Sequence, residues 1–138
     1  MLVFHSVFCS PPFPPPKHPG HVGACKFLLD KDGSLANSTT LHAGNTPFMW
    51  ACWSGSLDVA KLLVSEGNVD PFVCNEDGFT AAHWAASGGH GVPICNFLKE
   101  LRMSFVGKDA ENKKRETPLD CAKSYGCSDV VDWVAKQN

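Results

Sequence analysis

A six-residue phrase that begins with threonine recurs three times along the chain. It reads TPFMWA from residue 46, TAAHWA from residue 80 and TPLDCA from residue 117, with steps of 34 and 37 residues (46 to 80, 80 to 117). A period of this length indicates stacked supersecondary units. Such stacks usually bind other macromolecules along an extended face, so the repeat favours a binding function over catalysis.

Each phrase is predicted to begin a short inner helix, with threonine as its N-cap and small residues on its packing face. A second, outer helix follows, and its apolar residues recur at helical spacing, as in residues 57–64. Equivalent positions of this outer helix are Leu28, Leu63, Leu98 and Val134, which are 35, 35 and 36 residues apart (28 to 63, 63 to 98, 98 to 134). The sequence therefore predicts a series of two-helix units in regular register.

The chain resembles the ankyrin repeat family. The family phrase T-P-L-H-x-A, a later glycine, a Leu-Leu pair and G-x-x-D have counterparts at residues 46–48, Gly55, residues 62–63 and residues 67–70. The resemblance extends over about residues 20–138. It implies an all-α, ankyrin-type helix-turn-helix solenoid with short hairpin loops and a concave binding face.

The expected organisation is about three repeats preceded by an incomplete one. Residues 20–43 hold the outer helix of the partial repeat, and repeats follow at 44–77, 78–114 and 115–138, the last being C-terminal. Three repeats is near the lower limit for a stable stack. We therefore expect this chain to be a fragment of a longer array, or to need a partner to stay folded.

Three departures from the family pattern carry expectations of their own. Met49 and Asp120 replace the family histidine, so only His83 is expected to make the usual capping bonds. Arg115 stands where the other repeats have glycine before the threonine, so that loop is expected to turn differently. Residues 101–112 form a longer connection than their counterparts.

Residues 1–19 are rich in proline, with six prolines among residues 11–19. Such a run cannot be an α-helix, and we predict polyproline II or disorder there. Three interpretations stay open: a ligand for an SH3- or WW-type domain, a non-native piece of a gene model in residues 1–17, and a flexible tail. The second interpretation rests on the codons for Ser, Pro and Phe ahead of Lys17, which can all be pyrimidine-rich: a pyrimidine tract followed by AG is what the end of an intron looks like.

Candidate partner-binding residues lie at the ends of the inner helices and at the hairpin tips. In the family, the two positions before the terminal glycine point into the concave face, and the tips often contact partners. Aromatic side chains there would be good anchors, although packing on the next repeat or simple solvation explains each residue as well. The candidates are Asn45, Trp53, Ser54, Asp77, Phe79, Ser87, Arg115, Glu116 and Tyr125; Trp50 and Trp84 are expected in the core.

Other functions find no support in the sequence. There is no phosphate-binding loop, no nucleophile elbow and no zinc-protease motif, so we expect no catalytic residue, cofactor or metal. A net charge of −2 argues against nucleic acid, and no apolar run is long enough to span a membrane. Seven cysteines without a C-x-x-C pair are expected to be reduced, in an intracellular protein of cytoplasm or nucleus.

The expected function is therefore recognition of another protein through the concave face and hairpin tips. The alternative is that the repeats are the targeting or regulatory arm of a longer protein whose catalytic part is absent from this chain. The two interpretations differ in what lies upstream in the transcript, before the codon for Gly20.

Overall fold

The computed structural model describes residues 20–40, 43–88 and 92–137 of the 138-residue chain. Within these residues every regular element is helical, which confirms the all-α prediction. The elements are α2 (Gly20–Lys31), η1 (Gly33–Asn37), α3 (Pro47–Ser54), α4 (Leu57–Ser65), α5 (Ala81–Ser87), α6 (Val92–Glu100), η2 (Lys108–Ala110), α7 (Pro118–Ser124) and α8 (Ser128–Gln137). The proline-rich segment, with its three interpretations, lies outside the described residues.

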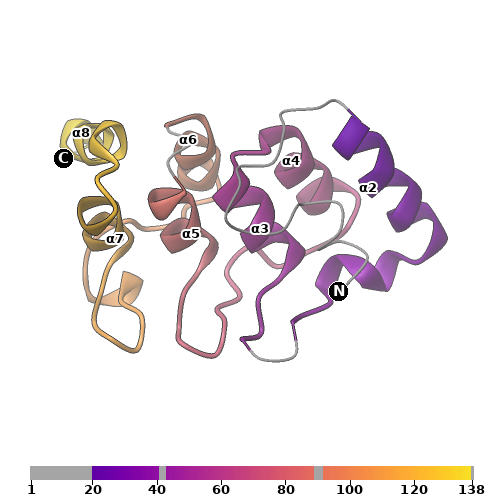
Figure 1. Ribbon diagram of the computed structural model, residues 1–138, viewed down its shortest axis with the longest axis horizontal. Coiled ribbons are helices and arrows are strands. Elements are labelled where there is room, and N and C mark those ends of the chain that lie inside the picture. Colours follow the sequence, from indigo (N-terminus) through magenta and orange to yellow (C-terminus); the bar gives the residue numbers. More distant parts are fainter. Residues whose placement is uncertain (1–19, 41–42, 89–91, 138) are drawn as a thin grey trace.

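The helices form two layers. The inner helices α3, α5 and α7 stack on one another, and the outer helices α2, α4, α6 and α8 form a second row, seen above them in Figure 1. Each inner helix also packs on the outer helix that follows it in sequence. The hairpin loops that precede the inner helices project together from one side of the stack, which gives the solenoid predicted from the repeat.

The inner helices α3 and α7 begin with reciprocal caps. Thr46 Oγ1 accepts a bond from Met49 N at 3.2 Å, and Met49 Sδ accepts one from Thr46 N at 3.5 Å. The same pair of bonds links Thr117 to Asp120, where Asp120 Oδ2 accepts from Thr117 N at 2.9 Å. The expectation that only His83 would cap was therefore wrong, because a thioether or a carboxylate three residues on also reaches the threonine amide.

Small side chains let the inner helices approach closely. Ala51, Ala81, Ala82, Ala86 and Ala122 all have no exposed surface. The tightest approach is at Gly88, the residue that follows α5: a Cβ built there would lie 2.1 Å from the carbonyl oxygen of Trp53 in α3. The spacing of the first two repeats therefore depends on a missing side chain as much as on the side chains present.

The hairpin turns share one backbone conformation. Gly44 and Gly78 precede the capping threonine by two residues and have φ values of 69° and 81°. Arg115 has φ 63° at the matching position, and its N–H bonds Asn112 O at 3.0 Å just as Gly78 N bonds Asn75 O at 3.0 Å. The expectation of a different turn was therefore wrong: the loop contacts hold arginine in the left-handed region despite its Cβ.

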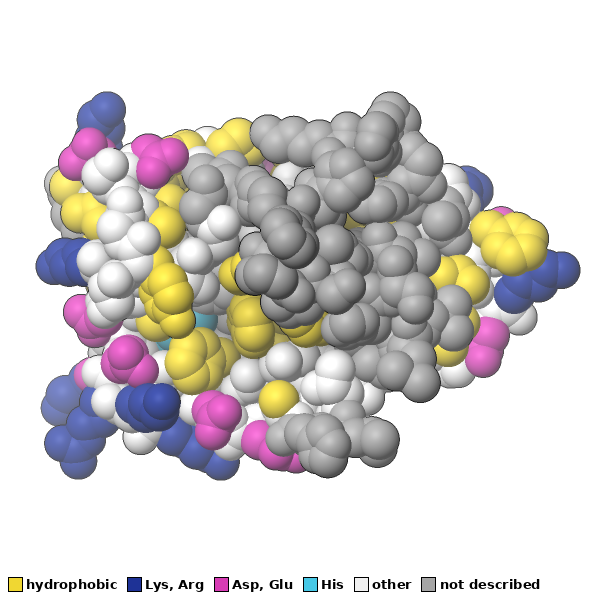
Figure 2. Space-filling model, in the orientation of Figure 1, with side chains coloured by type: hydrophobic (Ala, Val, Ile, Leu, Met, Phe, Trp, Pro, Cys, Tyr) yellow, Lys and Arg dark blue, Asp and Glu magenta, His cyan; other side chains and the backbone are white. Residues whose placement is uncertain are grey.

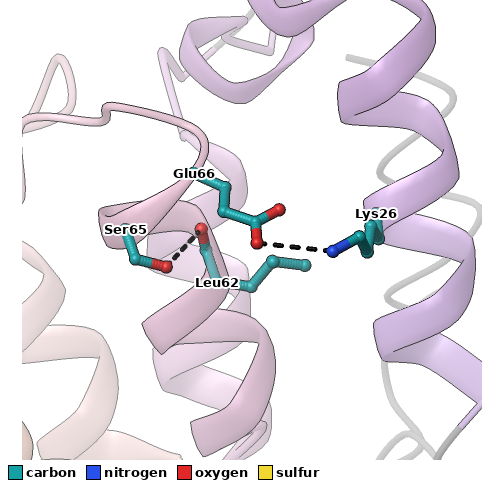
Figure 3. Close-up of polar contacts among 4 residues, drawn as sticks. All are labelled: Lys26, Leu62, Ser65 and Glu66. Atoms are coloured by element: carbon teal, nitrogen blue, oxygen red, sulfur yellow. Dashed lines mark hydrogen bonds and ion pairs between the residues drawn. The ribbon is translucent and has the colours of Figure 1, made fainter.

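Helix α2 covers the first full outer helix. Cys25 and Leu29 of α2 are buried in the common core. Lys26 Nζ lies 3.4 Å from Glu66 Oε1, at the end of α4, and the lysine reaches across the gap between the two helices in Figure 3. This contact is solvent-exposed and so contributes little, and the apolar contacts hold α2 in register with the outer row.

The longer connection after α6 closes the far end of the stack. Phe105 is buried and meets Trp133 of α8 edge to face, with ring centroids 5.1 Å apart. Leu119 N donates to Phe105 O at 3.1 Å, which ties the connection to α7. The extra residues therefore add core to the last repeat.

We expect Gly88→Ala to lower the free energy of unfolding by about 1–3 kcal/mol, because α5 must move away from the α3 backbone to admit the methyl group. Urea unfolding followed by circular dichroism measures the change. Gly23→Ala is the matched control, since a Cβ at that site in α2 meets no heavy atom within 4 Å. Equal midpoints for the two variants would contradict the close approach.

Arg115→Gly should stabilise the chain by about 0.5–1 kcal/mol, since glycine adopts positive φ freely and loses only part of that gain to its larger unfolded-state entropy. The expected rise in melting temperature is about 2–4 °C. Lys114→Gly is the control, because Lys114 is not among the described residues with positive φ and glycine should destabilise there. A fall in melting temperature for Arg115→Gly would show that the arginine side chain stabilises the loop.

Candidate protein-binding groove

A groove runs over the inner helices where they meet the hairpin loops. Its volume is about 340 Å³. We call it the aromatic groove and define it by its lining residues: Ala43, Asn45, Trp53, Asn75, Asp77, Phe79, Trp84, Ser87, Lys114 and Tyr125. These residues come from α3, α5, the residue after α7 and all three hairpins, so the groove exists only when the repeats are stacked.

Aromatic rings form the base of the groove. Trp50 connects two of them: its ring centroid is 6.0 Å from that of Trp53, nearly perpendicular to it, and 5.6 Å from that of Trp84. Phe79 extends the cluster and lies 6.5 Å from Trp84 and 5.3 Å from His83. Edge-to-face and tilted contacts of this kind are favourable, and they fix the orientation of the exposed ring edges.

One polar atom in this base lacks a partner. Trp84 Nε1 is buried, and no described residue offers it a hydrogen-bond acceptor. A buried N–H without an acceptor costs free energy, whereas an added carbonyl would satisfy it. The unpaired indole N–H of Trp84 is therefore a cost within this aromatic cluster.

Buried asparagines hold the hairpin loops beneath the groove. Asn75 Oδ1 accepts from the N–H groups of Asp77 and Phe79 at 3.0 and 2.9 Å, and Asn75 Nδ2 donates to Asn45 Oδ1 at 2.8 Å. Asn112 repeats the arrangement one hairpin later, accepting from Lys114 N and Glu116 N. Each loop is thus ordered internally before any ligand arrives.

Adjacent loops are also joined through their backbones. Glu76 N donates to Ala43 O at 3.0 Å, and Lys113 N donates to Asp77 O at 3.0 Å. These two bonds fix the rim of the groove, and they set acidic and basic tips side by side. Figure 2 shows dark blue side chains gathered at the lower left, over the hairpin before α7, with magenta ones beside them.

His83 links α5 to the third hairpin. Its Nδ1 accepts from Thr80 N at 3.1 Å, so Nε2 carries the proton and donates to Glu116 O at 2.8 Å. Burial lowers the pKa of His83 below its ordinary value, although the bond to Glu116 and the charges of Glu116 and Asp120 act in the opposite direction. The neutral ring therefore acts as a two-sided connector between repeats.

The structure brings most of the predicted binding residues to one place. Trp53, Asp77, Phe79, Ser87 and Tyr125 line the aromatic groove, and Tyr125 is 71% exposed. No comparison or contact tests binding at any of these positions, so their role stays a prediction.

The other four candidates lie differently. Asn45 lines the groove but is 8% exposed and bonded to Asn75, and Ser54 is buried with its hydroxyl donating to Ala51 O at 3.1 Å. Arg115 and Glu116 sit on the third hairpin and are absent from the groove lining. The hydrogen bonds of Asn45 and Ser54 therefore support the fold from within.

Four residues that line the groove were not among the predicted binding residues: Ala43, Asn75, Trp84 and Lys114. Trp84 was expected to be core, but it is only partly buried, packing on Trp50 on one side and lining the groove on the other. Asn75 could have been found, because Asn75 and Asn112 are 37 residues apart (75 to 112), the same step as Thr80 to Thr117. An asparagine repeated in register indicates a repeated turn.

The described residues were also compared with what a metal site or a reactive thiol needs. No group of three or more His, Cys, Asp or Glu side chains in that part of the chain could hold a metal ion. Burial raises the pKa of the Cys25 and Cys121 thiols to about 11 and of Cys95 to about 12, so these thiols stay protonated and unreactive. Among the same residues no helix has both the length and the apolar character needed to cross a bilayer.

Comparison with known proteins agrees with this architecture. The family model described as "Ankyrin repeats (3 copies)" matches residues 18–72 and 66–138. The chain belongs to the ankyrin repeat family. The hairpin before each inner helix and the two rows of helices are therefore the ankyrin loops and the ankyrin helix pairs.

Curated relatives extend the match across distant organisms. A protein of Rickettsia bellii (strain RML369-C) named as an ankyrin repeat protein is 28% identical over 114 residues, which is 82% of this chain and 60% of that protein. Palmitoyltransferase ZDHHC17 of Danio rerio is 39% identical over 83 residues, 56% of this chain and 12% of the enzyme. Palmitoyltransferase akr1 of Schizosaccharomyces pombe is 38% identical over 63 residues, 44% of this chain and 10% of the enzyme. This chain thus spans between a tenth and three fifths of the length of these relatives.

We expect acid to destabilise the chain through His83. Since its folded pKa lies below the unfolded value of about 6.5, the unfolded state binds the proton more readily. The stability from the neutral ring is therefore present above about pH 6.5 and is lost as the pH falls below it. Unfolding free energies between pH 8 and pH 5 measure the slope.

His83→Gln is the comparison that isolates this residue, because glutamine does not titrate. Its unfolding free energy should be lower at pH 8 and should fall less steeply toward pH 5, by up to about 1.4 kcal/mol per pH unit. Parallel pH curves for the two proteins would assign the acid sensitivity to other groups.

Proposed function

We propose that this chain is a protein-binding module that recognises its partner through the aromatic groove, without catalysing a reaction. Ankyrin repeats generally serve as protein-interaction modules. The observation that carries the proposal is the convergence of aromatic side chains from three successive repeats on one open groove, with Tyr125 largely exposed at its end.

The physical chemistry of the groove suits a peptide or a protein edge. Trp and Tyr are enriched at the positions that contribute most to protein interfaces, since each buries a large area and loses little rotamer entropy. Asp77 and Lys114 stand among the lining residues and can fix the direction of a bound segment by charge.

Preorganisation supports the same conclusion. Trp53 is held by Trp50, and the hairpin rim is held by the Asn75 bonds and the two inter-loop backbone bonds. Side chains that are already ordered lose little entropy on binding, so more of the contact energy appears as affinity.

The test is a comparison of partner affinity between the full chain and single groove variants. Partners captured by the wild-type chain are purified and titrated by calorimetry. Trp53→Ala and Tyr125→Ala should each weaken the affinity at least about tenfold, the loss expected when an interface hot spot is removed.

Phe27→Ala is the matched control, since Phe27 is an aromatic of comparable exposure (59%) on α2, outside the groove. It should leave the affinity unchanged. Affinities that are equal for wild type, Trp53→Ala and Tyr125→Ala would refute the groove as the binding site.

A second candidate is that the repeats are the targeting or regulatory arm of a longer protein. The relatives favour it, because two are named palmitoyltransferases and their match to this chain covers about a tenth of their length. Sequencing the transcript upstream of the Gly20 codon tests this candidate: an open reading frame that joins a larger coding region supports it, and one that starts at Met1 with no further domain downstream argues against it.

A further inference from the structure

We propose that the aromatic groove selects an extended peptide segment of another protein in which one basic and one acidic residue flank an apolar residue. The charged hairpin tips beside the groove set this choice. The inference rests on the proposed function of the groove as a protein-binding site, and it adds the chemistry of the partner.

Neighbouring hairpin tips carry opposite charges. The acidic tip, Glu76 and Asp77, belongs to the hairpin before α5, and the basic tip, Lys113, Lys114 and Arg115, belongs to the hairpin before α7. All five residues are exposed. One member of each tip, Asp77 and Lys114, lines the aromatic groove, so a bound segment meets both signs of charge along one rim.

The charges of the two tips are not used within the fold. Among the described residues the one ion pair joins Lys26 to Glu66. Glu116, the acid next to the basic tip, has its carboxylate turned toward Asn112, whose Nδ2 donates to Glu116 Oε1 at 3.3 Å. The tip side chains therefore remain available to groups of opposite charge on a ligand.

The main chain of each tip is fixed. Lys113 N donates to Asp77 O at 3.0 Å, Asp77 N donates to Asn75 Oδ1 at 3.0 Å, and Lys114 N donates to Asn112 Oδ1 at 2.9 Å. These bonds use only the backbone of the charged residues. The loops thus hold the charges in place while the charged side chains themselves stay free of the loop contacts.

The spacing of the tips sets the spacing of charges on the ligand. Packed helices lie about 8–10 Å apart, and the loops that lead into α5 and α7 are in backbone contact. An extended chain advances about 3.3 Å per residue. A basic and an acidic residue about two or three positions apart in the ligand can therefore meet the acidic and the basic tip together.

The aromatic rings account for the apolar residue between these charges. Trp53, Phe79 and Tyr125 line the same groove, and Phe79 follows the acidic tip by two residues. In Figure 2 hydrophobic side chains lie directly above the charged side chains at the lower left. The rings supply most of the contact area, and the rim charges select among apolar ligands and fix their direction.

The test exchanges the charges of the tips. The swap variant carries Asp77→Lys and Lys114→Asp together, so the net charge stays at −2 and the backbone bonds of both loops are kept. A displayed library of random peptides is selected on the wild-type chain and, separately, on the swap variant. Selected peptides are then synthesised and titrated against both proteins by calorimetry.

Peptides selected on the wild-type chain should carry the basic, apolar and acidic residues in one constant order. Those selected on the swap variant should carry the two charges in the opposite order. A wild-type peptide should bind the swap variant at least about tenfold more weakly, because both rim contacts become repulsive. Its affinity for the wild-type chain should fall as salt is added, since exposed charges are screened.

The control variant exchanges charges away from the groove. It carries Asp132→Lys and Lys136→Asp, two exposed residues of α8 that do not line the groove, and its net charge is also unchanged. It should bind the wild-type peptides with unaltered affinity. Circular dichroism melting curves of both variants show that the fold is kept.

Two outcomes overturn the proposal directly. One is equal affinity of the selected peptides for the wild-type chain and the swap variant. The other is self-association of the free chain, measured by sedimentation, that the swap variant abolishes, since a second copy would then occupy the groove.

Further outcomes separate this inference from the function on which it rests. If the selected peptides lack the charge pair but lose affinity in Trp53→Ala, the inference fails and the proposed function stands. If they carry the charge pair but bind Trp53→Ala and Tyr125→Ala as tightly as wild type, the tips bind without the groove and the proposed function fails. A selection that yields no binding peptide overturns both.

Discussion

Close contact between the inner helices is the constraint on which the rest of the structure depends. Alanines face one another across α3, α5 and α7, and Gly88 lets its backbone meet the carbonyl of Trp53. Helices that approach this closely set the hairpin loops at a spacing where Glu76 N can reach Ala43 O and Lys113 N can reach Asp77 O. The groove therefore depends on the small residues that let the inner helices approach, although its aromatic rings come from other residues.

The sequence predicts the elements well because their signals are local. The threonine phrase places each inner helix, and the outer helices follow from apolar spacing. The loop at Arg115 shows where local reasoning fails: arginine alone predicts a changed turn, but the buried Asn112 side chain holds the same left-handed conformation that Gly78 adopts. The bonds from Arg115 N and Glu116 N to Asn112 hold this turn, and the signal for them is the asparagine repeated at residues 75 and 112, not the identity of residue 115.

The groove could be predicted only in part for a related reason. The family resemblance places Trp53 and Tyr125 at positions that point into the concave face, and both line the groove. Ser54 holds the second of these positions and Asn45 lies at a hairpin tip, but both turn inward, since their bonds are to Ala51 and Asn75. Trp84 is harder still, because one face of its ring packs in the core while the residue also lines the groove. A sequence prediction that assigns each residue as either buried or exposed cannot describe Trp84, which is partly buried.

Stability and binding are coupled in this architecture through His83. The neutral ring holds the cap of α5 on one side and the Glu116 carbonyl of the third hairpin on the other, and Phe79 of the groove packs against it. Protonation would place a donor where Thr80 N already donates, which weakens the cap. The third hairpin, bonded to His83 through Glu116 O, and Phe79, which packs on the His83 ring, would then both be held less firmly. Conditions that loosen the stack should therefore also loosen the groove, because the same side chain orders both.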